Sequence, residues 1–126
     1  MSAPVALAGA LAIALGLAHS VIGELRVVGP ICARPDVPPL WGRAELMRRT
    51  VRFAWHLTSI AWITAGALLL VFAGRLLEQT ALLGVRVIAA SFLASAALAF
   101  VVSRGRHPAW VVCLAIAAAA WLGARG

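Results

Sequence analysis

Residues 3–24 read APVALAGALAIALGLAHSVIGE, and this stretch decides the class of the fold. It carries no charge before Glu24 and matches the roughly 20 residues that a helix needs to cross the hydrocarbon core of a bilayer. Three further apolar stretches follow. The stretches lack the alternation of apolar and polar residues that is typical of strands in membrane barrels. Since backbone groups in hydrocarbon must then pair within one segment, we predict helices at about 3–23, 51–73, 81–102 and 108–122.

The composition agrees with a membrane protein. Of the 126 residues, 63% are hydrophobic and only 12% are charged, which is more apolar surface than a soluble domain of this size can bury. No basic residue precedes the first apolar stretch, so we interpret it as a retained helix and not as a secretory signal. The expected fold is all-α: a single integral membrane four-helix bundle, residues 1–126, running up-down-up-down. Gly9 and Gly16, seven residues apart, predict close helix contacts on the first helix.

Arginine is distributed unevenly between the connecting segments. The segment 24–50 is rich in arginine and the turn 103–107 contains two more, whereas the second connection is poor in basic residues. Because basic residues concentrate on the cytoplasmic side, the segment 24–50 is predicted to be a cytoplasmic loop. Both chain termini are then predicted to be periplasmic.

The loop 24–50 contains four prolines, which are expected to interrupt any long helix. Its later part, LWGRAELMRR at 40–49, is predicted to form a short amphipathic helix on the membrane surface. Its contacts with anionic lipid headgroups are expected from Trp41, Arg43, Arg48 and Arg49. This explains the net charge of +7 without nucleic acid, which we do not expect as a partner.

Polar residues gather at one end of the predicted helices. His19, His56 and His107 all fall at the cytoplasmic boundary, together with Glu24. Ser20 and Glu24, four residues apart, share a helix face, whereas His19 points elsewhere unless the helix unwinds at Gly23. Polar side chains of transmembrane helices usually face the bundle interior, so we predict a cytoplasm-facing pocket in which His19 and His56 converge. The remaining pocket-lining residues are predicted to be Ser20, Arg52 and Ser59.

Two interpretations of these residues stay open. Imidazole and carboxylate groups suit a transition metal, and two histidines at matched depth suit a haem, with His19, His56, Glu24 and His107 as candidate ligands. No HExxH or ExxH pair supports a specific metal site. In the structural interpretation, the histidines bond to neighbouring groups and Glu24 pairs with Arg26 or Arg52. The cofactor and any enzymatic activity therefore remain open.

The stretches HSVIGE at 19–24, RFAWH at 52–56 and RHP at 106–108 carry a resemblance. The chain resembles a group of small bacterial four-helix integral membrane proteins without an assigned activity, which implies a location in the bacterial inner membrane. Three hypotheses of function follow. They are a metal- or haem-binding protein with a His/Glu/Arg pocket, an accessory or assembly subunit of a larger membrane complex, and a small transporter working as a homo-oligomer.

Overall fold

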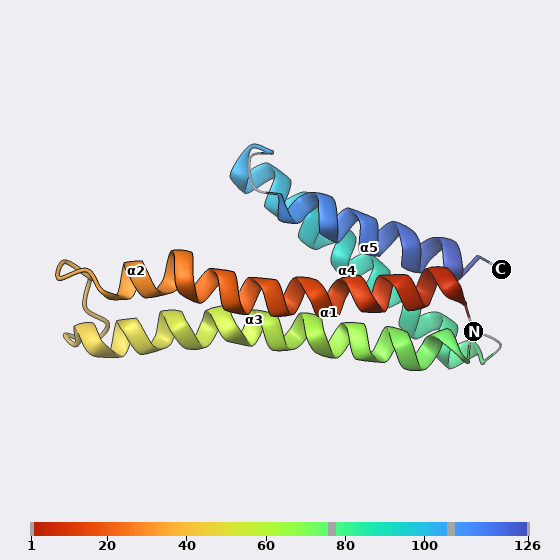
Figure 1. Ribbon diagram of the computed structural model, residues 1–126, viewed down its shortest axis with the longest axis horizontal. Helices are drawn as coiled ribbons and strands as arrows, with labels where there is room; N and C mark the ends of the chain where they lie inside the picture. The colour runs from red at the N-terminus through yellow and green to blue at the C-terminus, as the bar shows by residue number, and fades with distance from the viewer. Residues whose placement is uncertain (1, 76–77, 106–107, 126) are drawn as a thin grey trace. The chain divides into compact units, whose positions relative to one another are not determined.

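The computed structural model describes residues 2–75, 78–105 and 108–125, and every regular element within them is helical (Figure 1). This confirms the predicted all-α class. The elements in chain order are α1 (Ala3–Gly23), the π-helix η1 (Glu24–Val28), α2 (Gly29–Cys32), α3 (Ala44–Ala73), α4 (Gln79–Ser103) and α5 (Ala109–Gly123).

Three of the helical segments are long and apolar enough to span a membrane: Ala3–Cys32, Ala44–Ala73 and Gln79–Val101. The last helix, α5, corresponds to the fourth predicted span; it is apolar but has only 15 residues. Large apolar side chains such as Leu17, Phe53 and Leu98 are exposed along the helices. Outward-facing apolar side chains of this kind are typical of helices that contact lipid.

The first helix is longer than the sequence predicted. It does not end at Gly23 but continues through η1 and α2 to Cys32, so the predicted loop 24–50 shrinks to residues 33–43. The physical reason is a widened turn, in which the Gly29 amide donates to the Glu24 carbonyl five residues back. Pro30, which lacks an amide hydrogen, then occupies the first turn of α2, where its missing donor costs little.

The predicted surface helix at 40–49 is also different. Residues Leu40 and Arg43 form a tight turn through two backbone hydrogen bonds, with positive φ angles at Trp41 (48°) and Gly42 (76°). From Ala44 onward the segment is the start of α3 and not a separate helix. Positive φ is unusual for a bulky residue such as Trp41, and here it directs the connection back into α3.

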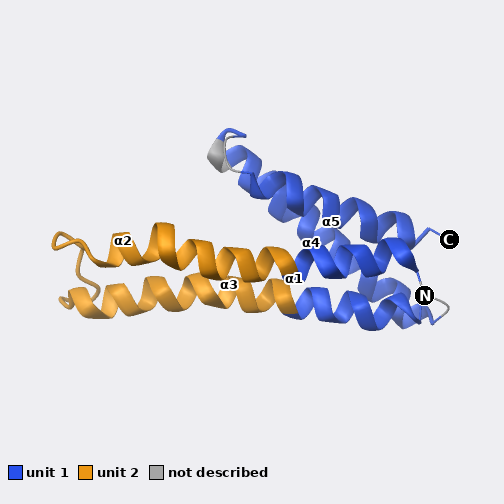
Figure 2. Cartoon of the chain, in the orientation of Figure 1, with its two compact units in different colours: residues 1–13, 64–126 blue, residues 14–63 orange. Residues whose placement is uncertain are grey.

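The described chain divides into two compact units (Figure 2). The first unit comprises residues 1–13 and 64–126, and in it α4 packs against α5. Its α1 and α3 segments meet at glycines, since a Cβ added to Gly9 would lie 2.8 Å from the Gly66 carbonyl oxygen. This close approach agrees with the small-residue contact predicted for Gly9.

The second unit comprises residues 14–63 and contains the polar cluster described below. Its two helical arms lie side by side and are joined by the loop 33–43 (Figure 2). A Cβ on Gly16 would lie 2.8 Å from the Ser59 carbonyl oxygen, and a Cβ on Gly23 would overlap the indole of Trp55. The absence of side chains at these two positions brings the polar residues of the two arms within hydrogen-bonding reach.

Candidate functional site

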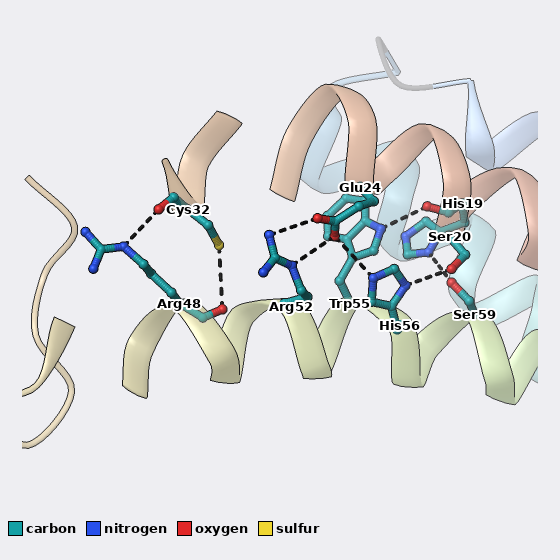
Figure 3. Close-up of polar contacts among 9 residues, drawn as sticks. All are labelled: His19, Ser20, Glu24, Cys32, Arg48, Arg52, Trp55, His56 and Ser59. Carbon is teal, nitrogen blue, oxygen red and sulfur yellow. Dashed lines mark hydrogen bonds and ion pairs between the residues drawn. The ribbon is translucent and has the colours of Figure 1, made fainter. Parts of the chain in front are cut away.

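Six of the predicted pocket residues lie together in the second unit (Figure 3). The spacing of the residues on each helix explains their convergence, because residues three or four apart share a helix face. One arm presents His19, Ser20 and Glu24, and the other presents a stripe at spacings of four and three. That stripe consists of Arg52, His56 and Ser59.

Two reciprocal histidine–serine pairs join the arms. The Nδ1 atom of His19 lies 2.9 Å from the Oγ of Ser59, and the Oγ of Ser20 lies 2.7 Å from the Nδ1 of His56. Each helix therefore supplies one imidazole and one hydroxyl. Ser59 is buried at 2% exposure, where an unpaired hydroxyl would be costly, so its pairing is needed for close helix packing.

Glu24 connects the second pair to a cation. Its Oε2 atom lies 3.2 Å from the Nε2 of His56 and 3.2 Å from the Nε of Arg52, while its Oε1 lies 2.9 Å from the Nη2 of Arg52. The two-point contact with a planar guanidinium fixes the orientation of the carboxylate. The Glu24 side chain is 33% exposed and that of Arg52 is 48% exposed, so this end of the cluster is accessible.

Two tryptophans enclose His19. Its ring stacks on Trp55 with centroids 4.4 Å apart and meets the edge of Trp62 at 4.9 Å. The Trp55 indole also donates to the His19 carbonyl at 2.9 Å. The sequence analysis did not include these tryptophans among the pocket residues. The signal that could have placed them at the site is their spacing of four and three from Ser59, which puts all three on one face.

The contacts of His56 define its tautomer. An ionised carboxylate can only accept, so the Nε2–H of His56 donates to Glu24, and Nδ1 of the neutral ring then accepts from the Ser20 hydroxyl. The resulting series is hydroxyl, imidazole, carboxylate. Chemically, such a series can pass a proton from the hydroxyl to the ring while the carboxylate stabilises the imidazolium.

The described residues do not support the predicted metal or haem site. They contain no group of three or more His, Cys, Asp or Glu side chains that could hold a metal ion. Both nitrogens of His56 already have side-chain partners, Ser20 and Glu24, so a metal would have to displace one of them. His107, the fourth predicted ligand, lies outside the described residues.

The residues predicted to contact lipid headgroups differ in their surroundings. Trp41 is 86% exposed, and Arg43 and Arg49 are exposed, as surface contacts require. Arg48 is instead turned toward the end of α2, where its Nε donates to the Cys32 carbonyl at 2.8 Å and its Nη2 to the Arg34 carbonyl at 3.0 Å. Its role in the described structure is therefore to cap a helix end.

The loop that follows α2 has its own ion pair. Arg34 contacts both carboxylate oxygens of Asp36, at 2.8 and 2.6 Å. The Arg34 guanidinium holds the pKa of the Asp36 carboxyl below its usual range. Both side chains are well exposed, so the pair orders the loop locally and adds little stability.

Comparison of the chain with known protein families, with curated proteins and with solved structures found no match in any of the three. The resemblance carried by HSVIGE, RFAWH and RHP therefore stays a prediction.

Proposed function

We propose that this chain is a multi-pass protein of the bacterial inner membrane, with four helices running up-down-up-down, and that its polar cluster is a proton-transfer site. The membrane location is supported by three helical segments long and apolar enough to span a bilayer. Ionisable groups inside such segments are costly and usually mark functional sites. The cluster is the place where this chain concentrates them.

One observation carries the proposal of proton transfer: His56 is bonded through both ring nitrogens, to the Ser20 hydroxyl and to the Glu24 carboxylate. An imidazole can accept a proton at one nitrogen and release another from the second. Arg52 keeps the carboxylate in the orientation that the ring requires. The side chains themselves thus supply an acid, a base and a stabilising charge.

This function differs from two of the hypotheses raised by the sequence. A metal or haem function requires the imidazoles as ligands, whereas His56 is engaged by a hydroxyl and a carboxylate. If the chain is instead an accessory subunit of a larger complex, the cluster has only to hold two helices together and does not transfer protons. The tautomer and the proton exchange of His56 distinguish these cases.

The test uses the full chain, labelled with ¹⁵N-histidine, in lipid nanodiscs at neutral pH. We expect NMR spectra in which His56 carries its proton on Nε2 and accepts a hydrogen bond at Nδ1. The variants His19→Asn and His107→Asn assign the signals. The variant Glu24→Gln is expected to change the rate at which the His56 ring proton exchanges with water.

A proton on Nδ1 of neutral His56, or one equivalent of metal or haem in the purified protein, would contradict proton transfer. If Glu24→Gln lowers only the stability and leaves the ring-proton exchange unchanged, the cluster is a structural clasp. The accessory-subunit hypothesis would then be favoured.

A further inference from the structure

We infer that Ser20 is an activated nucleophile that reacts with long-chain acyl esters or thioesters at the membrane boundary, an inference that rests on the proposed proton transfer. The geometry is that of a nucleophile, a base and an orienting group, with Ser20 2.7 Å from His56 and His56 3.2 Å from Glu24. Covalent catalysis is recognised by this arrangement of roles and not by sequence order.

The accessibility of the two serines selects Ser20. Ser59 is buried at 2% exposure, so no substrate reaches it, although it also contacts an imidazole. Ser20 is only partly buried, and the neighbouring Glu24 and Arg52 lie on the accessible side of the cluster. Ser20 is therefore the expected reactive serine. Ser59, which also contacts an imidazole but is buried, is the residue in the same chain that should not react.

The reaction step conserves atoms and charge. The Ser20 Oγ attacks the carbonyl carbon and its proton moves to the Nδ1 of His56, leaving an imidazolium beside the Glu24 carboxylate. When the acyl carbon–oxygen or carbon–sulfur bond breaks, the leaving alcohol or thiol takes that proton. Water then hydrolyses the Ser20 ester by the same route, with His56 as the base.

The surroundings of the cluster indicate an apolar acyl group. Exposed apolar side chains occur on both arms close to the cluster in sequence: Val21 follows Ser20, and Phe53 and Leu57 lie three residues before and one residue after His56. An acyl chain can lie along these side chains while its carbonyl meets Ser20. This arrangement disfavours small polar esters, which would leave the apolar surface uncovered.

Ser20 lies inside α1, where the backbone amides bond within the helix. Amides pointing at the new oxyanion, which accelerate acyl transfer in many hydrolases, are not available from such a position. We therefore expect slow acylation, and covalent capture is a sharper test than turnover. A fluorophosphonate with a dodecyl chain is the probe, since the Ser20 Oγ displaces fluoride at phosphorus while His56 takes the proton.

The full chain in lipid nanodiscs is treated with the probe, and the adduct is located by peptide mass spectrometry. We expect one adduct, on Ser20. Ser20→Ala should abolish it, and His56→Gln should slow labelling by about 100-fold or more, the usual range for loss of a general base. Thr58→Ala, which removes an exposed hydroxyl outside the cluster, should label at the wild-type rate.

No adduct on the wild-type chain, or an adduct at another residue, would overturn the inference, and this outcome does not depend on the folding of any variant. Labelling of His56→Gln at the wild-type rate would overturn it as well. If the Nε2–H tautomer of His56 is observed but no adduct forms, the inference that Ser20 is a nucleophile is wrong and the proposal of proton transfer still holds. If neutral His56 carries its proton on Nδ1, both the proton-transfer proposal and the inference about Ser20 are contradicted.

Discussion

Ser59 is the one buried polar residue in the described part of the chain, and its hydroxyl pairs with His19. A hydroxyl inside an apolar helix interface is tolerated when it has a partner, here His19, and costs about 1–3 kcal/mol when it loses that partner. The His19 imidazole likewise loses a hydrogen-bond partner if the Ser59 hydroxyl is removed. Single polar contacts in this unit therefore have larger effects than contacts on the exposed faces.

The variant Ser59→Ala leaves the His19 Nδ1 without its hydroxyl partner, and we expect it to lower the free energy of unfolding by about 0.5–2 kcal/mol. Thr58→Ala is the matched control. The Thr58 hydroxyl is exposed and, among the described residues, bonds only to the Ala54 carbonyl of its own helix, at 3.2 Å, so its loss should change little. Unfolding of both variants in mild detergent, followed by circular dichroism, measures the difference. Equal effects would show that the contact with His19 does not stabilise the unit.

At the scale of the element, the first helix is continuous to Cys32 because two features act together. The widened turn at Glu24–Val28 keeps the backbone helical up to Pro30, which has no amide hydrogen to donate. Arg48 then forms hydrogen bonds with carbonyl groups where α2 ends. Helix ends have unpaired carbonyls, and a guanidinium near them forms hydrogen bonds and interacts favourably with the helix dipole. The helix end thus depends on a side chain 16 residues further along the chain.

Replacing Arg48 with alanine removes the hydrogen bonds to the Cys32 and Arg34 carbonyls, and we expect the end of α2 to fray. The expected cost is about 0.5–1.5 kcal/mol, the usual range for such hydrogen bonds. Hydrogen exchange of residues 30–36, followed by mass spectrometry, should become faster. Arg49→Ala is the control, because Arg49 is exposed and its one ion pair within the described part of the chain is with Glu45 on its own helix. Faster exchange in Arg49→Ala as well would indicate a general effect of charge and not a cap.

At the scale of the whole molecule, helix length limits the membrane arrangement. The segments Ala3–Cys32 and Ala44–Ala73 each have 30 residues, or about 45 Å at ~1.5 Å per residue, which exceeds a hydrocarbon core of roughly 30 Å. Each segment must tilt or extend beyond the core. The 15 residues of α5 reach only about 22 Å, which is shorter than the core, so a crossing by α5 requires local thinning of the bilayer or flanking residues that lengthen the span.

The proposed four crossings place both termini on the periplasmic side and the loop 33–43 in the cytoplasm. We expect an alkaline phosphatase fusion to be active at the C-terminus and inactive in the loop, with the reverse result for green fluorescent protein. A C-terminus on the same side as the loop would mean that α5 does not cross. It would leave three spans.

Much of the fold follows from the sequence by itself. Apolar stretches of span length predict the helical class, and spacings of three and four place Arg52, His56 and Ser59 on one face. Matched positions near the ends of two antiparallel helices predict that the polar residues around His19 and around His56 lie at the same level. These features are local or depend on length alone, so pattern and composition determine them.

Only the tertiary structure decided which groups pair. His19 bonds to Ser59 and Ser20 bonds to His56, across 40 and 36 residues, and a rotation of either helix would exchange or break these pairs. The register is set by close contacts at Gly16 and Gly23, which bring the two helices together. The same register places Trp55 on His19. Since these distances depend on how two surfaces interlock, and not on either helix alone, no local pattern specifies them.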